Sequence, residues 1–324
     1  MTVVIDELAP TIAPESDFPD LRTMRPLPDL RNGLNLNQCR EGSELFLGLV
    51  RKEAESCGVD ERALRVRALL HLPRIVAYTG SITMSRVERE LWHCARQLRK
   101  DASQAEAIVP KGVYALNDLK FTEDFDPLVA GKLISSMHYL GSARAGSRYF
   151  ALVDPVHGRP VTVGGAAPLE WKRVSNWAKD QFKVSPEKIW DVARVFSCPS
   201  APPNAVSFLL ARMRNSLAQG AVDLLLTAVD PNLGFTGASY RAANWRRCLT
   251  IAPRPYLYLD CRYISPRQLK ERFGTSSLTE LRVRHPDRRF EQSRVRLLDS
   301  LIFCCPVRSK VPPDSAGFDR RLHR

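Results

Sequence analysis

Apolar and polar positions follow the clearest pattern between residues 189 and 229. Ile189–Phe196 alternates apolar and polar residues and ends at a Cys-Pro-Ser-Ala-Pro-Pro loop, which predicts a strand. Asn204 then stands at the start of a predicted helix that it can cap. The helix places five apolar residues at helical spacing: Val206, Leu209, Leu210, Met213 and Leu217. Val222–Val229 is almost continuously apolar, as in a strand buried on both faces. Two such strands with a crossover helix form a parallel βαβ unit.

Ligands of βαβ units bind at the carboxyl ends of the strands, and polar residues collect at both ends here. Asp230, Pro231 and Gly234 break the second strand, and a further helix can begin near Thr236. The predicted rim carries Asn204, Ser207, Asp230, Asn232, Thr236, Ser239 and Tyr240.

The first part of the chain has the pattern of helices followed by a hairpin. Helices are predicted for Glu41–Gly58, for Glu61–Leu72, where Pro73 interrupts or ends the helix, and for Met84–Lys100. A pair of short strands is expected at 107–109 and 112–116. This order is the layout of a winged helix-turn-helix, whose recognition helix would be Ser85–Lys100. A plain helical lobe with a solvated charged face is the alternative. The basic residues of the third helix are Arg86, Arg89, Arg96, Arg99 and Lys100, which are the candidate DNA contacts.

Further elements are expected on either side of the βαβ unit. Arg148–Val153 and Pro160–Gly165 predict a hairpin, and Ala166–Trp177 predicts a loop. In that loop Lys172 and Arg173 are candidate DNA contacts beside two tryptophans, which can stack on a base or pack in the core. Beyond Trp245 we expect strands at Pro255–Tyr263, Leu281–His285 and Leu297–Phe303, and a helix at Ser265–Phe273.

A chain of 324 residues is long enough for two domains. We expect a disordered acidic tail at 1–35, a helical domain at 36–125, a catalytic domain at 126–305 and a basic tail at 306–324. No stretch of eighteen apolar residues and no signal-peptide pattern occurs, so no membrane partner and a cytoplasmic location are expected. None of the eight cysteines forms a Cys-x-x-Cys pair, which argues against a zinc ribbon or a disulfide scaffold.

The formal net charge of +13 indicates which kind of partner the protein binds. The first thirty residues hold six acidic residues and two arginines, so the excess of positive charge lies in the rest of the chain. Such a surface attracts a polyanion by counterion release. Double-stranded DNA is therefore the predicted partner.

Two motifs carry a resemblance to a known family. Pro-x-Asn-Ala-x-Ser opens the helix at Asn204, and Gly-x-Thr-Gly-x-x-Tyr-Arg-Ala-x-Asn-Trp spans Gly234–Trp245. Over roughly Leu133–Trp245 the chain resembles the Mom family of phage DNA-modification proteins. The resemblance implies an α/β (or α+β) fold with a GNAT-like, mixed and strongly twisted sheet flanked by helices. It also implies addition of a carbamoylmethyl group to adenine in DNA, and a phage or prophage origin.

The resemblance also assigns residues. It points to His138 and Tyr139 as a pair facing the site, to Arg194 on the fourth strand, and to Asp230 and Tyr240 around the Gly234 loop. Asp230 would serve as base or hold the amine, Tyr240 would protonate the leaving group or orient the donor, and Arg194 would offset negative charge. Iron has been suggested for family relatives, with His138 and Asp230 as its candidate ligands here.

An acyl donor such as acetyl-CoA is the implied cofactor. Asn204, Ala205 and Ser207 open the central helix, where free amides and the helix dipole can bind phosphate. The glycine-rich sequence that usual GNAT enzymes have there is absent, as it is in the Mom family.

Two other functions fit the same residues. The chain can be a GNAT N-acyltransferase that uses acetyl-CoA on a protein or small-molecule amine. It can also be a non-catalytic DNA-binding component of phage defence. The transferred group, the DNA sequence preference and the oligomeric state are left open by the sequence.

Overall fold

The computed structural model describes residues 40–80, 82–110, 112–220, 222–307 and 320–322. Its contacts divide the chain into two compact units. Unit 1 comprises Met1–Lys100, Asn232–Gly234 and Pro253–Leu298, and unit 2 comprises Asp101–Pro231, Phe235–Ala252 and Asp299–Arg324. The expected tail at 1–35 lies outside the described residues. The expected domains at 36–125 and 126–305 stay a prediction, but the packing groups Pro253–Leu298 with the N-terminal helices.

From Arg40 onward, where the described residues start, unit 1 contains three helices in succession, α2 (Arg40–Cys57), α3 (Glu61–Thr79) and α4 (Met84–Ala105). The Asp60 side chain caps α3 by accepting a hydrogen bond from the Ala63 N–H at 2.7 Å, and Gly80 ends it in the left-handed conformation. The expected break at Pro73 is wrong, because α3 continues through it to Thr79. Every residue from Leu72 to Tyr78 is buried, and burial on all sides stabilises a helix across a proline.

The Pro253–Leu298 segment of unit 1 forms a three-stranded sheet in the order β8-β7-β9 with two helices. Its elements are β7 (Leu257–Leu259), β8 (Arg262–Ile264), α9 (Pro266–Phe273), α10 (Leu278–Arg284) and β9 (Phe290–Gln292). This segment packs on α3. The Tyr78 and Tyr258 rings lie 4.5 Å apart, and the Tyr258 hydroxyl donates to the Arg74 carbonyl at 2.6 Å. The Arg294 N–H donates to the Ala77 carbonyl at 2.8 Å.

Three expected elements differ here. Residues 107–109 and 112–116 contain no strand, since the first range is a turn and the second is irregular chain leading into a short 3-10 helix at Leu116–Asp118, so the wing of the predicted winged helix-turn-helix is not formed by them. Leu281–His285 lies in α10 and its cap, not in a strand, because Ser277 caps a helix whose residue Leu281 is fully buried. Pro255–Tyr263 holds a hairpin that turns at two residues of positive φ, Asp260 and Cys261.

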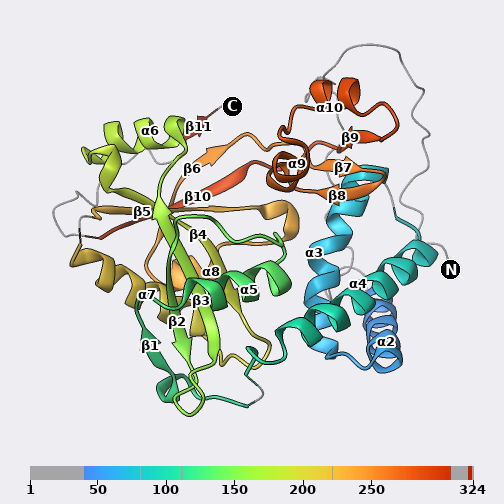
Figure 1. Ribbon diagram of the computed structural model, residues 1–324, viewed down its shortest axis with the longest axis horizontal. Coiled ribbons are helices and arrows are strands. Elements are labelled where there is room, and N and C mark those ends of the chain that lie inside the picture. The colour runs from blue at the N-terminus through green and yellow to red at the C-terminus, as the bar shows by residue number, and fades with distance from the viewer. Residues whose placement is uncertain (1–39, 81, 111, 221, 308–319, 323–324) are drawn as a thin grey trace. The chain divides into compact units, whose positions relative to one another are not determined.

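Unit 2 is built on an eight-stranded mixed sheet in the order β1-β2-β3-β4-β5-β10-β6-β11 (Figure 1). The strands are β1 (Lys120–Thr122), β2 (Arg148–Val153), β3 (Pro160–Pro168), β4 (Ile189–Ser197), β5 (Leu224–Val229), β6 (Arg246–Ile251), β10 (Ser300–Pro306) and β11 (Arg320–Leu322). The pairs β4–β5 and β6–β11 are parallel and the other neighbours are antiparallel. The predicted β2–β3 hairpin, the parallel βαβ unit and the mixed sheet are confirmed.

Helices cover both faces of this sheet. They are α5 (Pro127–Met137), α6 (Lys172–Phe182), α7 (Ala205–Ala218) and the short α8 (Ala238–Ala242). Leu225 packs with α7, whereas its neighbours Leu224 and Leu226 pack with α6, because successive strand residues point to opposite faces. A Cβ built on Gly164 in β3 would lie 2.5 Å from the Met213 sulfur, so α7 packs closely over the strand at this glycine.

The predicted loop at Ala166–Trp177 is wrong. β3 continues to Pro168, and α6 begins at Lys172 because Val174, Ala178 and Phe182 form an apolar helical face that is buried against the sheet. Within the described parts of the chain, no helix combines the length and apolar character that a membrane span needs.

Candidate active site

The neighbouring strands β4 and β5 stop pairing partway along their length. Their parallel pairing covers only Ile189–Asp191 against Leu224–Leu226. Beyond this point β4 stays paired with β3 up to Ser197, and β5 stays paired with β10 up to Val229. At the division the Thr227 hydroxyl donates to the Val192 carbonyl at 3.0 Å, so a side chain replaces the next ladder bond. We call this division, Val192–Ser197 against Thr227–Val229, the β4–β5 split.

A β-bulge lies at the same place in β4. The register with β3 shifts so that Gly165 pairs with Arg194 and Ala166 with Val192, which leaves Ala193 as the extra residue. The Arg194 guanidinium donates to the Ala193 carbonyl at 2.7 Å. Bulges take backbone groups out of the ladder and are frequent beside active sites. The backbone at Ala193 is therefore turned away from regular pairing at the start of the β4–β5 split.

Tyr240 brings a hydroxyl group to the split from α8. Its ring packs against Trp245 and Phe303, at 5.3 Å and 5.9 Å between centroids. Its oxygen lies 3.3 Å from the Thr227 hydroxyl. Burial raises the pKa of the Tyr240 phenol, and the hydrogen bond with Thr227 opposes this only in part. The phenol therefore keeps its proton at neutral pH.

Asp191 lies on the opposite side of the sheet, as the last paired residue of β4. Val192 belongs to the α7 side, so the preceding side chain points the other way. Arg144 forms an ion pair with the Asp191 carboxylate and donates to the Pro168 carbonyl at 2.6 Å. Burial raises the pKa of Asp191, while the Arg144 and Arg194 charges lower it in part. Sequence reasoning missed this carboxylate, for which an acidic residue inside an apolar strand was the available signal.

The predicted His-Tyr pair follows α5. His138 caps the helix, is buried, and accepts a hydrogen bond from the Leu140 N–H at its Nδ1 atom at 3.2 Å. The Tyr139 ring lies 4.4 Å from the His138 ring and 5.3 Å from the Phe235 ring, so the pair contacts the segment after Gly234.

Arg194 connects this turn to β4. Its Nε atom donates to the Ser142 carbonyl at 2.9 Å, four residues after His138. The structure thus brings together three of the predicted residues, namely His138, Tyr139 and Arg194, and gives Arg194 a positioning contact. Asp230 is half-buried at the end of β5, ahead of the Pro231 turn. Its role as a base stays a prediction.

The predicted donor-binding residues lie at the start of α7. Asn204 occupies the N-cap position with φ of +64°, but its exposed side chain makes no capping hydrogen bond, which corrects the expected capping role. The Ser207 hydroxyl donates to the Asn204 carbonyl at 2.9 Å, so it is bound within the first helical turn. Ala205 is buried. The backbone amides of this turn are the groups available for a phosphate.

The candidate DNA contacts are surface residues in both units. On α4, Arg89, Arg99 and Lys100 are exposed, Arg86 pairs with Glu90 at 2.7 Å, and Arg96 lies 4.6 Å above the ring of the exposed Trp92. On α6, Lys172 and Arg173 are exposed. Trp171 and Trp177 pack against the apolar cluster of α6, which favours core packing over base stacking.

The iron expectation has no ligand set to support it. Within the described residues no group of three or more His, Cys, Asp or Glu side chains could hold a metal ion.

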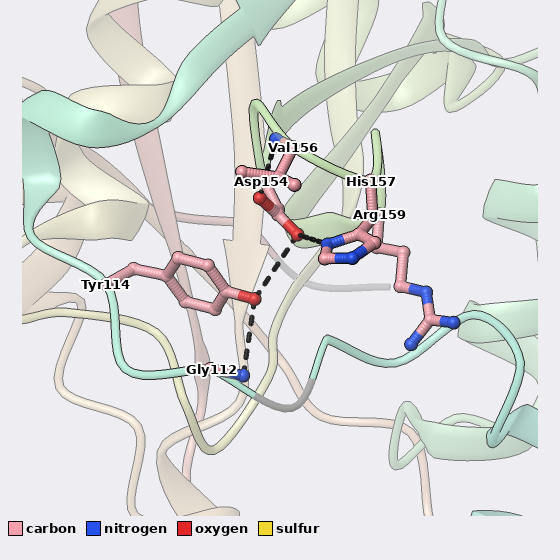
Figure 2. A pocket seen from close by; sticks show the side chains of 6 residues that line it. All are labelled: Gly112, Tyr114, Asp154, Val156, His157 and Arg159. Carbon is pink, nitrogen blue, oxygen red and sulfur yellow. Dashed lines mark hydrogen bonds and ion pairs between the residues drawn. The ribbon is translucent and has the colours of Figure 1, made fainter.

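A separate pocket of about 420 Å³ lies at the β2–β3 turn (Figure 2). Asp154 accepts from the Val156 N–H at 2.9 Å, contacts the His157 Nδ1 at 2.9 Å and accepts from the Tyr114 hydroxyl at 3.5 Å. The Val156 N–H, and then the His157 ring, lower the pKa of Asp154. Arg159 completes the lining. These contacts first of all fix the turn, and they leave an imidazole and a guanidinium facing the pocket.

No protein-family model matches the chain, and no curated protein does. Among solved structures, it has a distant similarity to GNAT acetyltransferases. A protein described as an acetyltransferase of the GNAT family from Desulfovibrio desulfuricans is 10% identical, with 59% of this chain and 99% of that chain covered and a TM-score of 0.33.

Nourseothricin acetyltransferase is 13% identical, with 51% and 67% covered and a TM-score of 0.27. The CoA-dependent acyl-homoserine lactone synthase MesI is 14% identical, with 52% and 68% covered and a TM-score of 0.26. Similarities at this level concern the fold, so the activity has to be argued from the residues of this chain.

Proposed function

We propose that unit 2 is an acyltransferase that moves an acyl group from an acyl-CoA thioester to an amine. The observation that carries this proposal is the β4–β5 split, which has a protonated phenol on one side of the sheet and a carboxylate of raised pKa on the other. The thioester would lie along the split, and its phosphates would meet the backbone amides at the start of α7.

The reaction requires two proton transfers, and the two side chains suit them. The amine nitrogen attacks the thioester carbonyl carbon, the carbon–sulfur bond breaks, and the thiolate leaves. Asp191, whose raised pKa makes it a stronger base than an ordinary carboxylate, takes the proton from the amine. Tyr240, which is protonated at neutral pH before the reaction, gives its proton to the thiolate sulfur. Backbone N–H groups that the bulge at Ala193 takes out of the ladder would bind the carbonyl oxygen.

The finer proposal concerns the acceptor, which we take to be the exocyclic amine of adenine in double-stranded DNA, as the Mom resemblance implies. Two observations support it. The chain carries a net charge of +13, with exposed arginines on α4 and exposed Lys172 and Arg173 on α6. The Tyr139 and Phe235 rings, which contact each other at a tilt of 46°, offer aromatic groups near the turn that Arg194 holds to β4, and flipped bases stack on aromatic side chains.

The test is nucleoside mass spectrometry of host DNA after expression of the wild type, Tyr240→Phe and Tyr114→Phe. A new adenine adduct in the wild type supports the DNA acceptor. Removing a general acid lowers such a rate by about 10²–10⁴-fold, so the adduct should be lost in Tyr240→Phe. Tyr114→Phe removes the same atom at the β2–β3 turn and should keep the adduct.

Thiol release from acetyl-CoA separates the two levels of the proposal. Release with a protein or small-molecule amine, but without DNA modification, would keep the acyltransferase and remove the DNA acceptor. DNA binding without thiol release or any base adduct would instead identify a non-catalytic DNA-binding protein.

A further inference from the structure

The segment between β6 and β10 contains a helix–turn–helix that neither the sequence patterns nor the proposed chemistry accounts for. α9 and α10 are joined by the four residues Gly274–Ser277, which is the connection length of DNA-binding helix–turn–helix motifs. Both helices lie beside the β8-β7-β9 sheet of unit 1 (Figure 1).

Each helix of this motif has defined ends. Ser265 and Gln268 form a reciprocal capping box at the start of α9, with Pro266 in the first turn. Gly274 ends α9 in the left-handed conformation, with φ of +76°. The Ser277 side chain accepts from the Glu280 N–H at 3.4 Å and caps α10.

The two helices share one small core. Leu269 of α9 and Leu281 of α10 are fully buried with Phe290 of β9. The Phe273 ring lies 5.0 Å from the His285 ring and 5.5 Å from the Phe290 ring, so the end of α9 is packed against the end of α10. The mutual placement of the helices is therefore fixed by packing within the segment.

The outer surface of the motif is strongly basic. Residues 253–298 hold eleven Arg or Lys against five Asp or Glu. Arg288, Arg289 and Arg294 pair with acidic neighbours. In contrast, the exposed side chains Arg267, Lys270 and Arg272 on α9 form no ion pair within the described residues.

The exposed side of α10 mixes three kinds of group. Thr279 and Val283 are exposed, and Val283 has 77% of its surface accessible. Arg282 is also exposed, but its Nε atom donates to the Phe290 carbonyl at 3.0 Å, so only its terminal N–H groups can contact a ligand. In the major groove, base edges are contacted by hydroxyl and guanidinium groups of a helix, and apolar side chains contact the methyl group of thymine. A second helix with this composition, after a first helix with unpaired cations, is the arrangement that crosses the DNA backbone and enters the groove.

We propose that α9 and α10 form a duplex-DNA-binding element, in which Arg267 and Lys270 contact phosphates and the Thr279–Val283 side of α10 lies in the major groove. This inference shares with the proposed function only the choice of DNA as partner. The recognition helix predicted at Ser85–Lys100 stays a prediction beside it.

The experiment measures binding of a labelled 20-base-pair duplex by fluorescence anisotropy over a range of NaCl concentrations. The logarithm of the binding constant falls linearly with the logarithm of the salt concentration, and each lost phosphate contact makes this dependence less steep by about 0.9. Arg267→Gln/Lys270→Gln loses two contacts, so its slope should be less steep by about 1.8. At 0.1 M salt this slope corresponds to binding weakened about 60-fold. Lys52→Gln/Arg62→Gln removes the same charge from α2 and α3 of the same unit and should bind like the wild type.

A second variant tests the base contacts. Thr279→Ala/Val283→Ala should keep the salt slope but change the sequences selected from a random duplex pool. Three results would overturn the inference. The first is an equal loss of duplex affinity in the two charge variants, and the second is an unchanged selected sequence for Thr279→Ala/Val283→Ala. The third is tighter binding of single-stranded DNA or RNA than of duplex DNA. Urea unfolding of every variant shows that its fold is retained.

The two proposals fail separately. If Arg267→Gln/Lys270→Gln loses duplex binding while the wild type releases no thiol from acetyl-CoA, the DNA element stands and the acyltransferase falls. If thiol release persists and duplex binding is absent in the wild type, the reverse holds.

Discussion

The Arg144–Asp191 ion pair allows a quantitative test of how the β4–β5 split is maintained. The side chains are 12% and 23% exposed, and Arg144 also donates to the Pro168 carbonyl. Removing one partner of a buried pair costs about 3–5 kcal/mol, because the other charge stays buried without compensation. Asp191 keeps some access to water, so we expect Arg144→Met to cost about 3 kcal/mol in the free energy of unfolding at pH 7.

The pKa of Asp191 determines how the cost of Arg144→Met in the free energy of unfolding changes with pH. Burial already raises the pKa of Asp191 above 3.8, and loss of Arg144 raises it further. A carboxyl group with a raised folded-state pKa binds its proton more tightly in the folded state. Its protonation therefore stabilises the fold below the unfolded pKa, and this stabilisation is lost as the pH rises through the folded pKa. The cost of Arg144→Met should be largest at pH 7 and should shrink as the pH falls toward 4.

Urea unfolding followed by tryptophan fluorescence is the assay. Four of the five tryptophans lie in unit 2, namely Trp171, Trp177, Trp190 and Trp245. A double-mutant cycle with Asp191→Asn should show a coupling of about 2 kcal/mol, because the double variant no longer buries an unpaired charge. A cost below about 1 kcal/mol, or a cost that is the same at pH 7 and pH 5, would refute the reasoning.

Two further predictions concern the surroundings of the site. Gly237→Ala adds a Cβ at φ of +74° only 2.3 Å from Phe303, and we expect it to cost about 2–4 kcal/mol from backbone strain and overpacking. Gly158→Ala, at φ of +66° with no atom within 4 Å, should cost only about 1 kcal/mol in the same urea assay, so equal costs would exclude the packing argument. A carboxyl NMR titration should place the pKa of Asp154 below 3.8, and His157→Ala should raise it only in part, because the backbone N–H that lowers it most remains. Because the pKa of Asp154 is lower in the folded state, its carboxylate stabilises the fold at pH values above the unfolded-state pKa, and this stabilisation is lost as the pH falls through the folded-state pKa. A measured pKa of Asp154 at its ordinary value would contradict the hydrogen bonds of the turn.

Local patterns were enough to predict the centre of unit 2. The β4–α7–β5 unit and the β2–β3 hairpin follow from apolar spacing and from turn residues that lie within a few positions of each element. α10 shows where such patterns become ambiguous. Leu-Arg-Val-Arg-His alternates like a strand, but Ser277 caps a helix and Leu278 and Leu281 share its inner side.

The missed features depend on neighbours that are distant in the sequence. Asp191 becomes a candidate base only because the fold buries it beside Arg144, 47 residues earlier. The burial of α3 around Pro73 likewise involves Tyr258, whose hydroxyl reaches the Arg74 carbonyl from 184 residues away. No periodicity or motif along the chain carries that information.

Unit 1 is composed of segments that lie far apart in the sequence, and this has a consequence for synthesis of the protein. The buried stretch Leu72–Tyr78 leaves the ribosome early, but Tyr258 and Arg294, which pack on it, are translated about 180 and 220 residues later. Until then, α3 presents an apolar surface without its partner, the state in which nascent chains associate with chaperones or aggregate. Asp101–Pro231 and Phe235–Ala252 of unit 2 are translated during this interval, so α3 waits for its partner segment while most of the other unit is made.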